Sequence, residues 1–196
     1  MKRLILASTS PYRADLLKKL GIPFESAKPN YDEDQEKNKL FQAEATPLLV
    51  AESLSKGKAY SVERIDATVI AGDQLVDFNN VILGKPNNFN GAKLQLQTMR
   101  GKTHRLITAV TVLTTEAEKH FNHITTLKMK DLSDTEIENY LKKDEPYDCA
   151  GGYKIEKSGL LLFSEITTDD FSAIQGLPLL WISERLKELG YEFFKS

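Results

Sequence analysis

The sequence predicts an α/β or α+β protein built around a mixed sheet. Segments with helical periodicity alternate with short apolar segments typical of buried strands. Two longer apolar segments in the middle of the chain, 106–114 and 121–129, are typical of long strands in a second sheet region. The length of 196 residues fits one domain or one elongated unit with two lobes.

The first third of the chain predicts a strand, a tight loop and two helices. Residues 3–7 (RLILA) form a short apolar run, and a Ser/Pro loop separates them from a predicted helix at 11–20. The polar segment 30–39 is expected to be a mobile loop. A second helix is predicted from Pro47 to about Val62, with Thr46 as its N-cap.

The remaining segments predict a hairpin, two further strands and three helices. They are a strand at 67–72, a hairpin of 75–78 with 81–83, helices at 90–100, 133–141 and 177–189, a loop at 144–152 and a strand at 160–166. The helix at 133–141 opens with the capping-box sequence Ser-Asp-Thr-Glu.

Composition and charge argue against several classes of protein. The formal net charge of -2 gives no overall attraction for nucleic acids, and no aromatic-basic stripe is present, so nucleic-acid binding is not expected. Cys149 is the only cysteine, so the sequence cannot form an intramolecular disulfide. No apolar run approaches the roughly 20 residues of a membrane span. A cytoplasmic protein without a membrane partner is therefore expected.

A candidate phosphate cradle lies in the first loop. Ser8 and Ser10 stand between a strand and a helix start, and Arg13 follows one turn into the helix. Free backbone N–H groups at a helix start, together with hydroxyls and a guanidinium, bind phosphate well. An N-cap serine beside a surface arginine would give the same pattern, and the spacing alone leaves these two interpretations even.

Two acidic residues are candidates for metal or water activation. Asp73 follows the predicted strand 67–72, at the strand end where α/β folds place ligands. Its carboxylate could hold a divalent cation or activate a water, or it could simply cap a turn. Glu33 lies in an acidic run, which is usually a solvated face, yet Mg²⁺ with a triphosphate needs one or two such carboxylates.

Two lysines could neutralise phosphates. Lys58 would emerge at the end of the buried stripe that Val50 and Leu54 form on the second helix. Lys85 lies between Gly84 and Pro86, a rigid context that would fix its direction. Most lysines are solvated surface groups, and that interpretation applies to each of them.

Several other catalytic patterns are absent from the sequence. His120 and His123 fall in a predicted strand, where positions i and i+3 face opposite ways, so they do not form a zinc pattern. The sequence contains no P-loop and no GxGxxG after a strand, and no Ser-His-Asp arrangement is suggested.

Seven motifs are spread nearly end to end along the chain. They are LILASTSPYRADLLKKLGIPF at the start, Glu33 after Tyr31-Asp32, Lys58-Ala59, VIAGDQLV, GKP at 84–86, CAGGYKIE at 149–156 and IQGLPLL near the end. In order and spacing they resemble the Maf-like nucleoside triphosphate pyrophosphatases. The stretch 164–173 matches that family weakly.

The resemblance implies one domain over residues 1–196, with a mixed α/β sheet flanked by helices and two lobes around a deep cleft. It implies attack of water at the bond between the α and β phosphates, release of pyrophosphate, and help from a divalent cation. Hard oxygen ligands favour Mg²⁺ or Mn²⁺. A homodimer is a further family-level expectation.

The resemblance also implies roles for individual residues. Asp73 matches the proton acceptor of the family, and Glu33 matches the acidic position near the metal, which Asp73 would share. The positions that match phosphate handling and catalysis are Ser8, Ser10, Arg13, Lys58 and Lys85.

Three positions indicate the base preference within the family. Tyr12, Gln74 and Glu156 look like the branch that hydrolyses 7-methyl-GTP, whereas the dTTP/UTP branch is expected to carry Arg, Thr and Gln there. A buried Glu156 carboxylate could accept hydrogen bonds from guanine and would favour a cationic, N7-methylated base. Tyr12 could add stacking or a cation–π contact. The alternatives are a dTTP/UTP pyrophosphatase and a nucleotide-binding regulator of septum formation.

Overall fold

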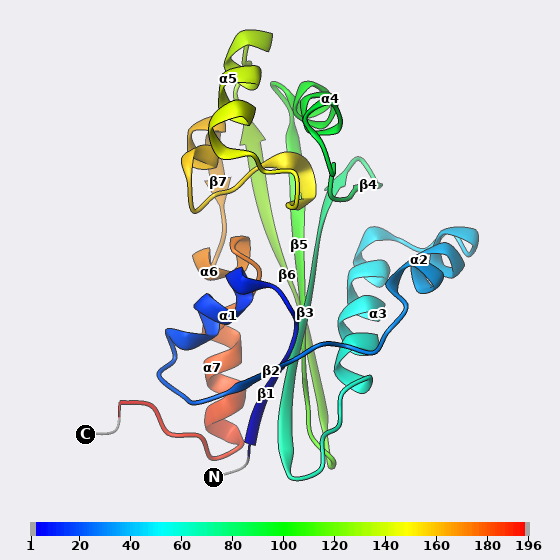
Figure 1. Cartoon of the computed structure of the whole chain (residues 1–196), viewed down its shortest axis with the longest axis vertical. Coiled ribbons are helices and arrows are strands. Elements are labelled where there is room, and N and C mark those ends of the chain that lie inside the picture. Colours follow the sequence, from blue (N-terminus) through cyan, green and yellow to red (C-terminus); the bar gives the residue numbers. More distant parts are fainter. Residues whose placement is uncertain (1–2, 195–196) are drawn as a thin grey trace. The chain divides into compact units, whose positions relative to one another are not determined.

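A computed structural model describes residues 3–194 and has a seven-stranded mixed sheet flanked by helices (Figure 1). The strands are β1 (Arg3–Ala7), β2 (Glu25–Ala27), β3 (Ala67–Phe78), β4 (Val81–Leu83), β5 (Thr103–Leu113), β6 (Glu118–Met129) and β7 (Phe163–Thr167). Their order is β2-β1-β3-β5-β6-β7, and β4 pairs with β3. Parallel pairing joins β1 to β2 and β3, and antiparallel pairing joins β3 to β4 and β6 to β7. The predicted mixed α/β fold is confirmed.

Seven α-helices and two short 3₁₀ helices are present in the described part of the chain. They are α1 (Pro11–Lys18), α2 (Glu33–Gln42), α3 (Pro47–Tyr60), α4 (Phe89–Met99), α5 (Asp134–Asp144), η1 (Ala150–Gly152), η2 (Ser158–Leu162), α6 (Phe171–Ile174) and α7 (Leu179–Glu188). Among the helices of residues 3–194, none combines the length and the apolar character that a membrane crossing requires.

Two sequence-based expectations about the elements are wrong, and one short strand was not predicted. Segment 30–39 was expected to be a loop, but α2 occupies most of it, because Asp32 caps the helix by accepting a hydrogen bond from the Gln35 backbone N–H at 2.9 Å. The strand expected at 160–166 begins only at Phe163, since η2 precedes it. The short strand β2 was not predicted, because its three residues carry no periodic signal.

The chain divides into two compact units. The first contains residues 3–73, 108–123 and 170–194 of the described chain, and the second contains residues 74–107 and 124–169. The division falls inside β3, β5 and β6, so each of these strands contributes residues to both units. The expectation of a single functional domain over residues 1–196 stays a prediction.

Alternation along β1 organises the core of the first unit. Leu4 and Leu6 pack with residues of α1 and α7, whereas Ile5 and Ala7 face a second cluster that includes Ala59 of α3. Figure 1 shows α1 and α7 on one side of β1 and α3 on the other. Burying each leucine side chain stabilises the fold by about 1.5–3 kcal/mol, so the two-residue period of β1 fixes the helices on both faces of the sheet.

The second unit begins with the predicted hairpin. Val76 pairs with Leu83 and Phe78 with Val81, and both Asn79 and Asn80 have positive φ angles of 54° and 64°. A two-residue loop with positive φ at both positions matches the right-handed twist of the flanking strands, which explains why two asparagines occupy it.

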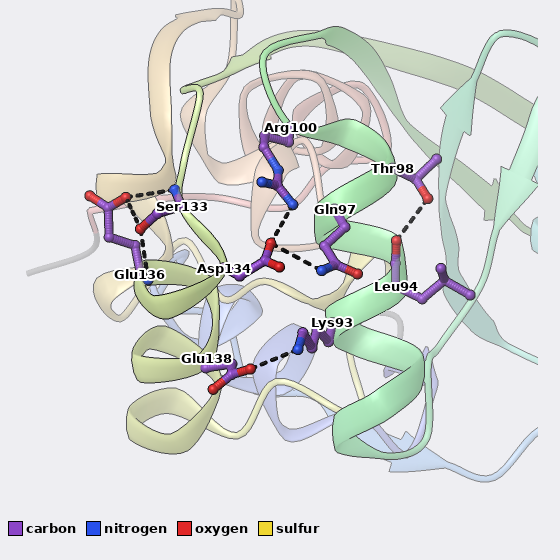
Figure 2. Close-up of polar contacts among 9 residues, drawn as sticks. All are labelled: Lys93, Leu94, Gln97, Thr98, Arg100, Ser133, Asp134, Glu136 and Glu138. Atoms are coloured by element: carbon purple, nitrogen blue, oxygen red, sulfur yellow. Dashed lines mark hydrogen bonds and ion pairs between the residues drawn. The ribbon is translucent and has the colours of Figure 1, made fainter.

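Polar contacts join α4 to α5 within the second unit, as Figure 2 shows. Lys93 of α4 pairs with Glu138 of α5 at 2.6 Å, and Arg100 pairs with Asp134 at 2.5 Å. The predicted capping box is present, because Ser133 and Glu136 exchange side-chain and backbone hydrogen bonds. Partly exposed ion pairs of this kind contribute about 0.2–1 kcal/mol each, so they fix the orientation of the two helices more than they stabilise them.

Candidate active site

The first loop presents two serine hydroxyls at the start of α1. Ser10 is the N-cap, and its hydroxyl accepts a hydrogen bond from the Arg13 backbone N–H at 3.5 Å. The Ser8 hydroxyl accepts one from the Ser10 backbone N–H at 3.1 Å, and Ser8 is buried. Both hydroxyls retain a proton to donate, so the loop has the hydrogen-bonding groups that a phosphate oxygen needs.

The Arg13 side chain runs between two glycines. Its Nε donates to the backbone carbonyl of Gly176 at 3.1 Å, and a Cβ placed on Gly72 would lie 3.4 Å from the same Nε. Gly176 has a φ of 120°, a conformation that other residues adopt only with strain. Burial lowers the pKa of the Arg13 guanidinium, and the charges of Asp73 and Glu33 act in the opposite direction. An arginine stays protonated in proteins, so Arg13 is a cation held in a fixed direction beside the residue that precedes Asp73.

Lys58 joins the two predicted acidic residues. Its Nζ lies 2.7 Å from Oδ1 of Asp73 and 2.9 Å from Oε2 of Glu33. The Lys58 side chain is 8% exposed, and that of Asp73 is 11% exposed. Val50 and Leu54 are buried on α3 as predicted, but Lys58 is buried with them and does not emerge at the end of the stripe. Two carboxylates that contact one ammonium nitrogen lie close enough together to share a single cation.

The position of Asp73 along its strand differs from the predicted one. It was expected just beyond the end of a strand, but β3 continues to Phe78 and Asp73 lies in its interior. The reason is that residues after Asp73 pair with β4 and prolong the strand. The carboxylate is consequently carried by a hydrogen-bonded strand, which positions it more rigidly than a turn would.

Tyr31 is a neighbour of this cluster that the sequence did not indicate as a site residue. Burial raises the pKa of its phenol to about 12, and nearby carboxylates, Glu36 first among them, act in the same direction. The Gly176 carbonyl was also missed as a partner of Arg13, although the IQGLPLL motif contains it. A backbone carbonyl carries no residue-type signal, which is why the sequence could not indicate it.

Of the other four predicted residues, Tyr12 is half-buried in α1 of the first unit, and three belong to the second unit. Lys85 is exposed, and the following Pro86 is buried so close to Gly91 that a Cβ there would overlap its carbonyl oxygen. The fixed direction that the Gly-Lys-Pro context predicted for Lys85 stays a prediction. Gln74 is half-buried next to Asp73 in β3. Glu156 is exposed, so the expectation that its carboxylate would be buried is wrong.

A polar network holds the segment that carries Glu156. Asp144 is buried and accepts hydrogen bonds from both the backbone N–H and the hydroxyl of Ser158, at 2.8 and 2.7 Å. Lys154, whose side chain is 8% exposed, pairs with Asp148 at 2.9 Å. The Tyr140 hydroxyl accepts from the Lys154 backbone N–H at 2.9 Å. The exposed position of Glu156 is thus supported from buried groups on both sides of it in the sequence.

Cys149 lies in the same segment and is half-buried. Burial raises the pKa of its thiol to about 12, and the negative charge of Asp148 adds to the effect. A thiol is a nucleophile only as the thiolate, so burial disfavours the reactive form of this cysteine near neutral pH.

No group of three or more His, Cys, Asp or Glu side chains is arranged as metal ligands within residues 3–194. The cation-binding oxygens that the structure brings together are the carboxylates of Glu33 and Asp73. Mg²⁺ is typically bound by one or two carboxylates together with phosphate oxygens of the substrate, so this donor set fits such an ion.

The fold and these residues define a class of protein. The model of the Maf-like protein family matches residues 3–189, and the chain belongs to that family. It is 44% identical to the 7-methyl-GTP pyrophosphatase of Bdellovibrio bacteriovorus, over 95% of this chain and 96% of the relative. It is 39% identical to the protein of the same name from Colwellia psychrerythraea (98% and 95% covered) and 40% identical to that from Polaromonas sp. (97% and 86% covered).

Proposed function

We propose that this protein hydrolyses 7-methyl-GTP to 7-methyl-GMP and pyrophosphate, and so removes a modified nucleotide from the pool. Relatives of that name match nearly the whole chain at 36–44% identity. The observation that carries the proposal is the contact of Lys58 with both Asp73 and Glu33, because it joins a candidate base, a cation and a second metal-binding carboxylate in one cluster.

Asp73 would act as the proton acceptor for the attacking water. Proton transfer to a positioned carboxylate contributes about 10²–10⁴-fold to a rate. The water oxygen bonds to the α phosphorus as the bond between that phosphorus and the bridging oxygen breaks. Pyrophosphate leaves with the electron pair of the broken bond. Arg13 and Lys58, with Lys85 of the second unit, would stabilise the charge on the phosphates, and Ser8 and Ser10 would donate hydrogen bonds to them.

Glu33 and Asp73 would hold a divalent cation, with Mg²⁺ or Mn²⁺ favoured by their hard oxygen atoms. When bound, such an ion supplies Lewis-acid stabilisation of phosphate charge. Lys58 contacts the same two carboxylates, so it neutralises them in the free protein and remains next to them as a cation for the substrate.

Base recognition would rest on Tyr12, Gln74 and Glu156. The Glu156 carboxylate can accept from the guanine N1–H and exocyclic amine together, and its negative charge favours a ring made cationic by N7-methylation. Because Glu156 is exposed in the free protein, its attraction for the base strengthens only as the bound nucleotide excludes water. The ring of Tyr12 would add a cation–π contact.

A substrate panel tests the proposal. Pyrophosphate release is measured for 7-methyl-GTP, GTP, dTTP and UTP, with Mg²⁺ and with a chelator. We expect 7-methyl-GTP to have the highest kcat/KM and the chelator to abolish turnover. If dTTP or UTP is turned over fastest, the protein is a pyrophosphatase of the other base preference. If no nucleotide is hydrolysed although nucleotides bind, a regulatory role replaces the enzymatic one.

The variant Glu156→Gln tests the specificity step separately. It keeps the size of the side chain and removes its charge. We expect kcat/KM for 7-methyl-GTP to fall at least tenfold relative to that for dTTP, because a lost charge-assisted bidentate contact is worth roughly 1.5–3 kcal/mol. An unchanged ratio would remove Glu156 from base recognition.

A further inference from the structure

Gly57 occupies an interior position of α3, where glycine is unfavourable. The structure explains why it is there. A Cβ placed on Gly57 would overlap three atoms of the Tyr31 side chain, namely Cζ, Cε2 and Oη. The aromatic ring therefore lies directly on the backbone of α3, and any larger residue at position 57 would displace it.

Both residues of this contact are close in sequence to residues of the candidate site. Gly57 immediately precedes Lys58, whose Nζ contacts Glu33 at 2.9 Å. Tyr31 precedes Glu33 by two residues, and Asp32 between them caps α2. Side chains from both ends of this three-residue segment thus contact consecutive residues of α3.

The helix α2 has little else to fix its start. Among its ten residues, all of them described, none is buried, and Phe41 is half exposed. Hydrophobic burial stabilises a helix in proportion to the apolar area it removes from water, so α2 gains little from that source. The ring of Tyr31 on Gly57 and the Glu33–Lys58 ion pair are contacts that hold its first turn against α3.

We propose that Tyr31 is a positioning residue for the active site: its ring, seated on Gly57, holds Glu33 at Lys58 and beside Asp73. The catalytic consequence rests on the proposed function, whereas the structural step does not. The ring carries the effect through its volume and not through its hydroxyl. The variant Tyr31→Phe should therefore keep Glu33 in place. The variants Tyr31→Ala and Gly57→Ala should each release Glu33.

The test is a double-mutant cycle on the full chain with Tyr31→Ala, Gly57→Ala and the double variant. Tyr31→Phe is the conservative variant, and Tyr60→Ala is the matched control, because Tyr60 is an exposed tyrosine at the end of α3 whose hydroxyl donates to Glu118. Two quantities are measured for each protein: the hydrogen-exchange rate of the first amides of α2, and kcat/KM for pyrophosphate release from 7-methyl-GTP. Melting temperature is recorded alongside.

We expect Tyr31→Ala and Gly57→Ala each to speed exchange in α2 and to lower kcat/KM about 100-fold, a loss typical of a catalytic group displaced by about 1 Å. The double variant should also lose about 100-fold, because both changes break one contact, whereas independent effects would multiply to about 10,000-fold. Tyr31→Phe should stay within about threefold of the parent protein, and Tyr60→Ala should match it.

A second comparison shows whether the effect passes through Glu33. In a Glu33→Gln background, Tyr31→Ala should cause little further loss, because the residue that it positions has already been changed. Gly57→Ala on its own raises helix propensity, so a merely structural glycine would give a protein of equal activity and equal or higher melting temperature.

Two results would overturn the proposal: parent-like exchange and turnover in Gly57→Ala, or a double variant whose loss is the product of the single losses. Failure of the proposed function is a separate outcome. If the parent protein releases no pyrophosphate from any nucleotide, the exchange measurements still show whether the ring on Gly57 fixes α2.

Discussion

The backbone carbonyl of Gly176 accepts a hydrogen bond from Nε of Arg13 at 3.1 Å, which links residues 163 positions apart in the sequence. An arginine can donate to a carbonyl from Nε and still present the two terminal nitrogens of its guanidinium to a phosphate. A lysine has a single nitrogen, so it could not donate to this carbonyl and also present two further nitrogens side by side to a phosphate. The residue type at position 13 therefore follows from the backbone of a distant segment.

The variant Arg13→Lys should show this difference. We expect kcat/KM for pyrophosphate release to fall about 100-fold while the melting temperature changes little, because the charge is kept and the fixed direction is lost. Arg3→Lys is the control, since the Arg3 side chain forms an exposed ion pair with Glu25 and its replacement should leave turnover unchanged. Parent-like turnover in Arg13→Lys would show that its charge alone is sufficient.

Asp73→Asn separates catalysis from binding. The amide keeps the size of the side chain and can still accept a hydrogen bond from Lys58, but it cannot take a proton from water. We expect pyrophosphate release to fall by about 10³-fold, with nucleotide affinity, measured by calorimetry, within tenfold of the parent. The exposed Asp66→Asn, just before the same strand, is the control. Unchanged release in Asp73→Asn would remove this carboxylate from the mechanism.

The variant Lys58→Met tests whether Asp73 and Glu33 share one cation, and the measured quantity is the free energy of unfolding instead of activity. Without the ammonium group, Asp73 and Glu33 face each other with no cation between them, and we expect the free energy of unfolding to fall by about 2 kcal/mol. That is less than for a fully buried pair, because Glu33 is 39% exposed. Urea unfolding measures the loss, and millimolar Mg²⁺ should restore stability more in the variant than in the parent.

Lys56→Met is the matched control for that measurement. Lys56 lies on the same helix and pairs with Glu52 and Glu118, but its side chain is 33% exposed, so its loss should cost under about 1 kcal/mol. Equal losses for the two lysines, or no response of Lys58→Met to Mg²⁺, would contradict a cation site formed by the two carboxylates.

His104 makes stability depend on pH below neutrality. Burial lowers the pKa of its imidazole to about 4, against 6.5 in the unfolded chain. The unfolded state binds the proton more readily between these values, so the contribution of His104 is intact above pH 6.5 and is lost as the pH falls towards 4. We expect urea unfolding to show a loss of about 2 kcal/mol from this residue between pH 7 and pH 5.

The variant His104→Gln isolates that contribution. Glutamine can retain a hydrogen bond with the Tyr153 hydroxyl, which lies 3.1 Å from His104 Nε2, and it does not titrate in this range. The difference in unfolding free energy between pH 7 and pH 5 should be about 2 kcal/mol smaller in the variant. If both proteins lose the same amount, His104 is not the group responsible.

The sequence predicted the elements with a strong local signal. The β1 strand, the capping box at Ser133 and the hairpin through two asparagines are present because each depends on residues a few positions apart. The prediction for segment 30–39 is wrong, since its charged residues show no apolar stripe and α2 depends on the Asp32 cap. A helix held by contacts at one end carries little hydrophobic periodicity for the sequence to show.

For the candidate site, the sequence indicated residue types but not their partners. The stripe on α3 correctly predicted that Val50 and Leu54 are buried, but Lys58 is buried with them. It could not show that Lys58 contacts Glu33, because that contact depends on where α2 packs. Tyr31 was likewise missed, because the space above Gly57 exists only in the folded chain. The roles assigned to the site residues remain predictions for the experiments above.

The reaction rate of the Cys149 thiol can report on the solvent exposure of the segment that carries Glu156. As the single thiol of the chain, with its pKa raised to about 12, it should react very slowly with a chromogenic disulfide reagent at pH 8. Any event that exposes the segment to water would lower that pKa and accelerate the colour change. The wild-type molecule therefore contains its own stopped-flow reporter of solvent exposure in this segment, and no label or engineered residue is required.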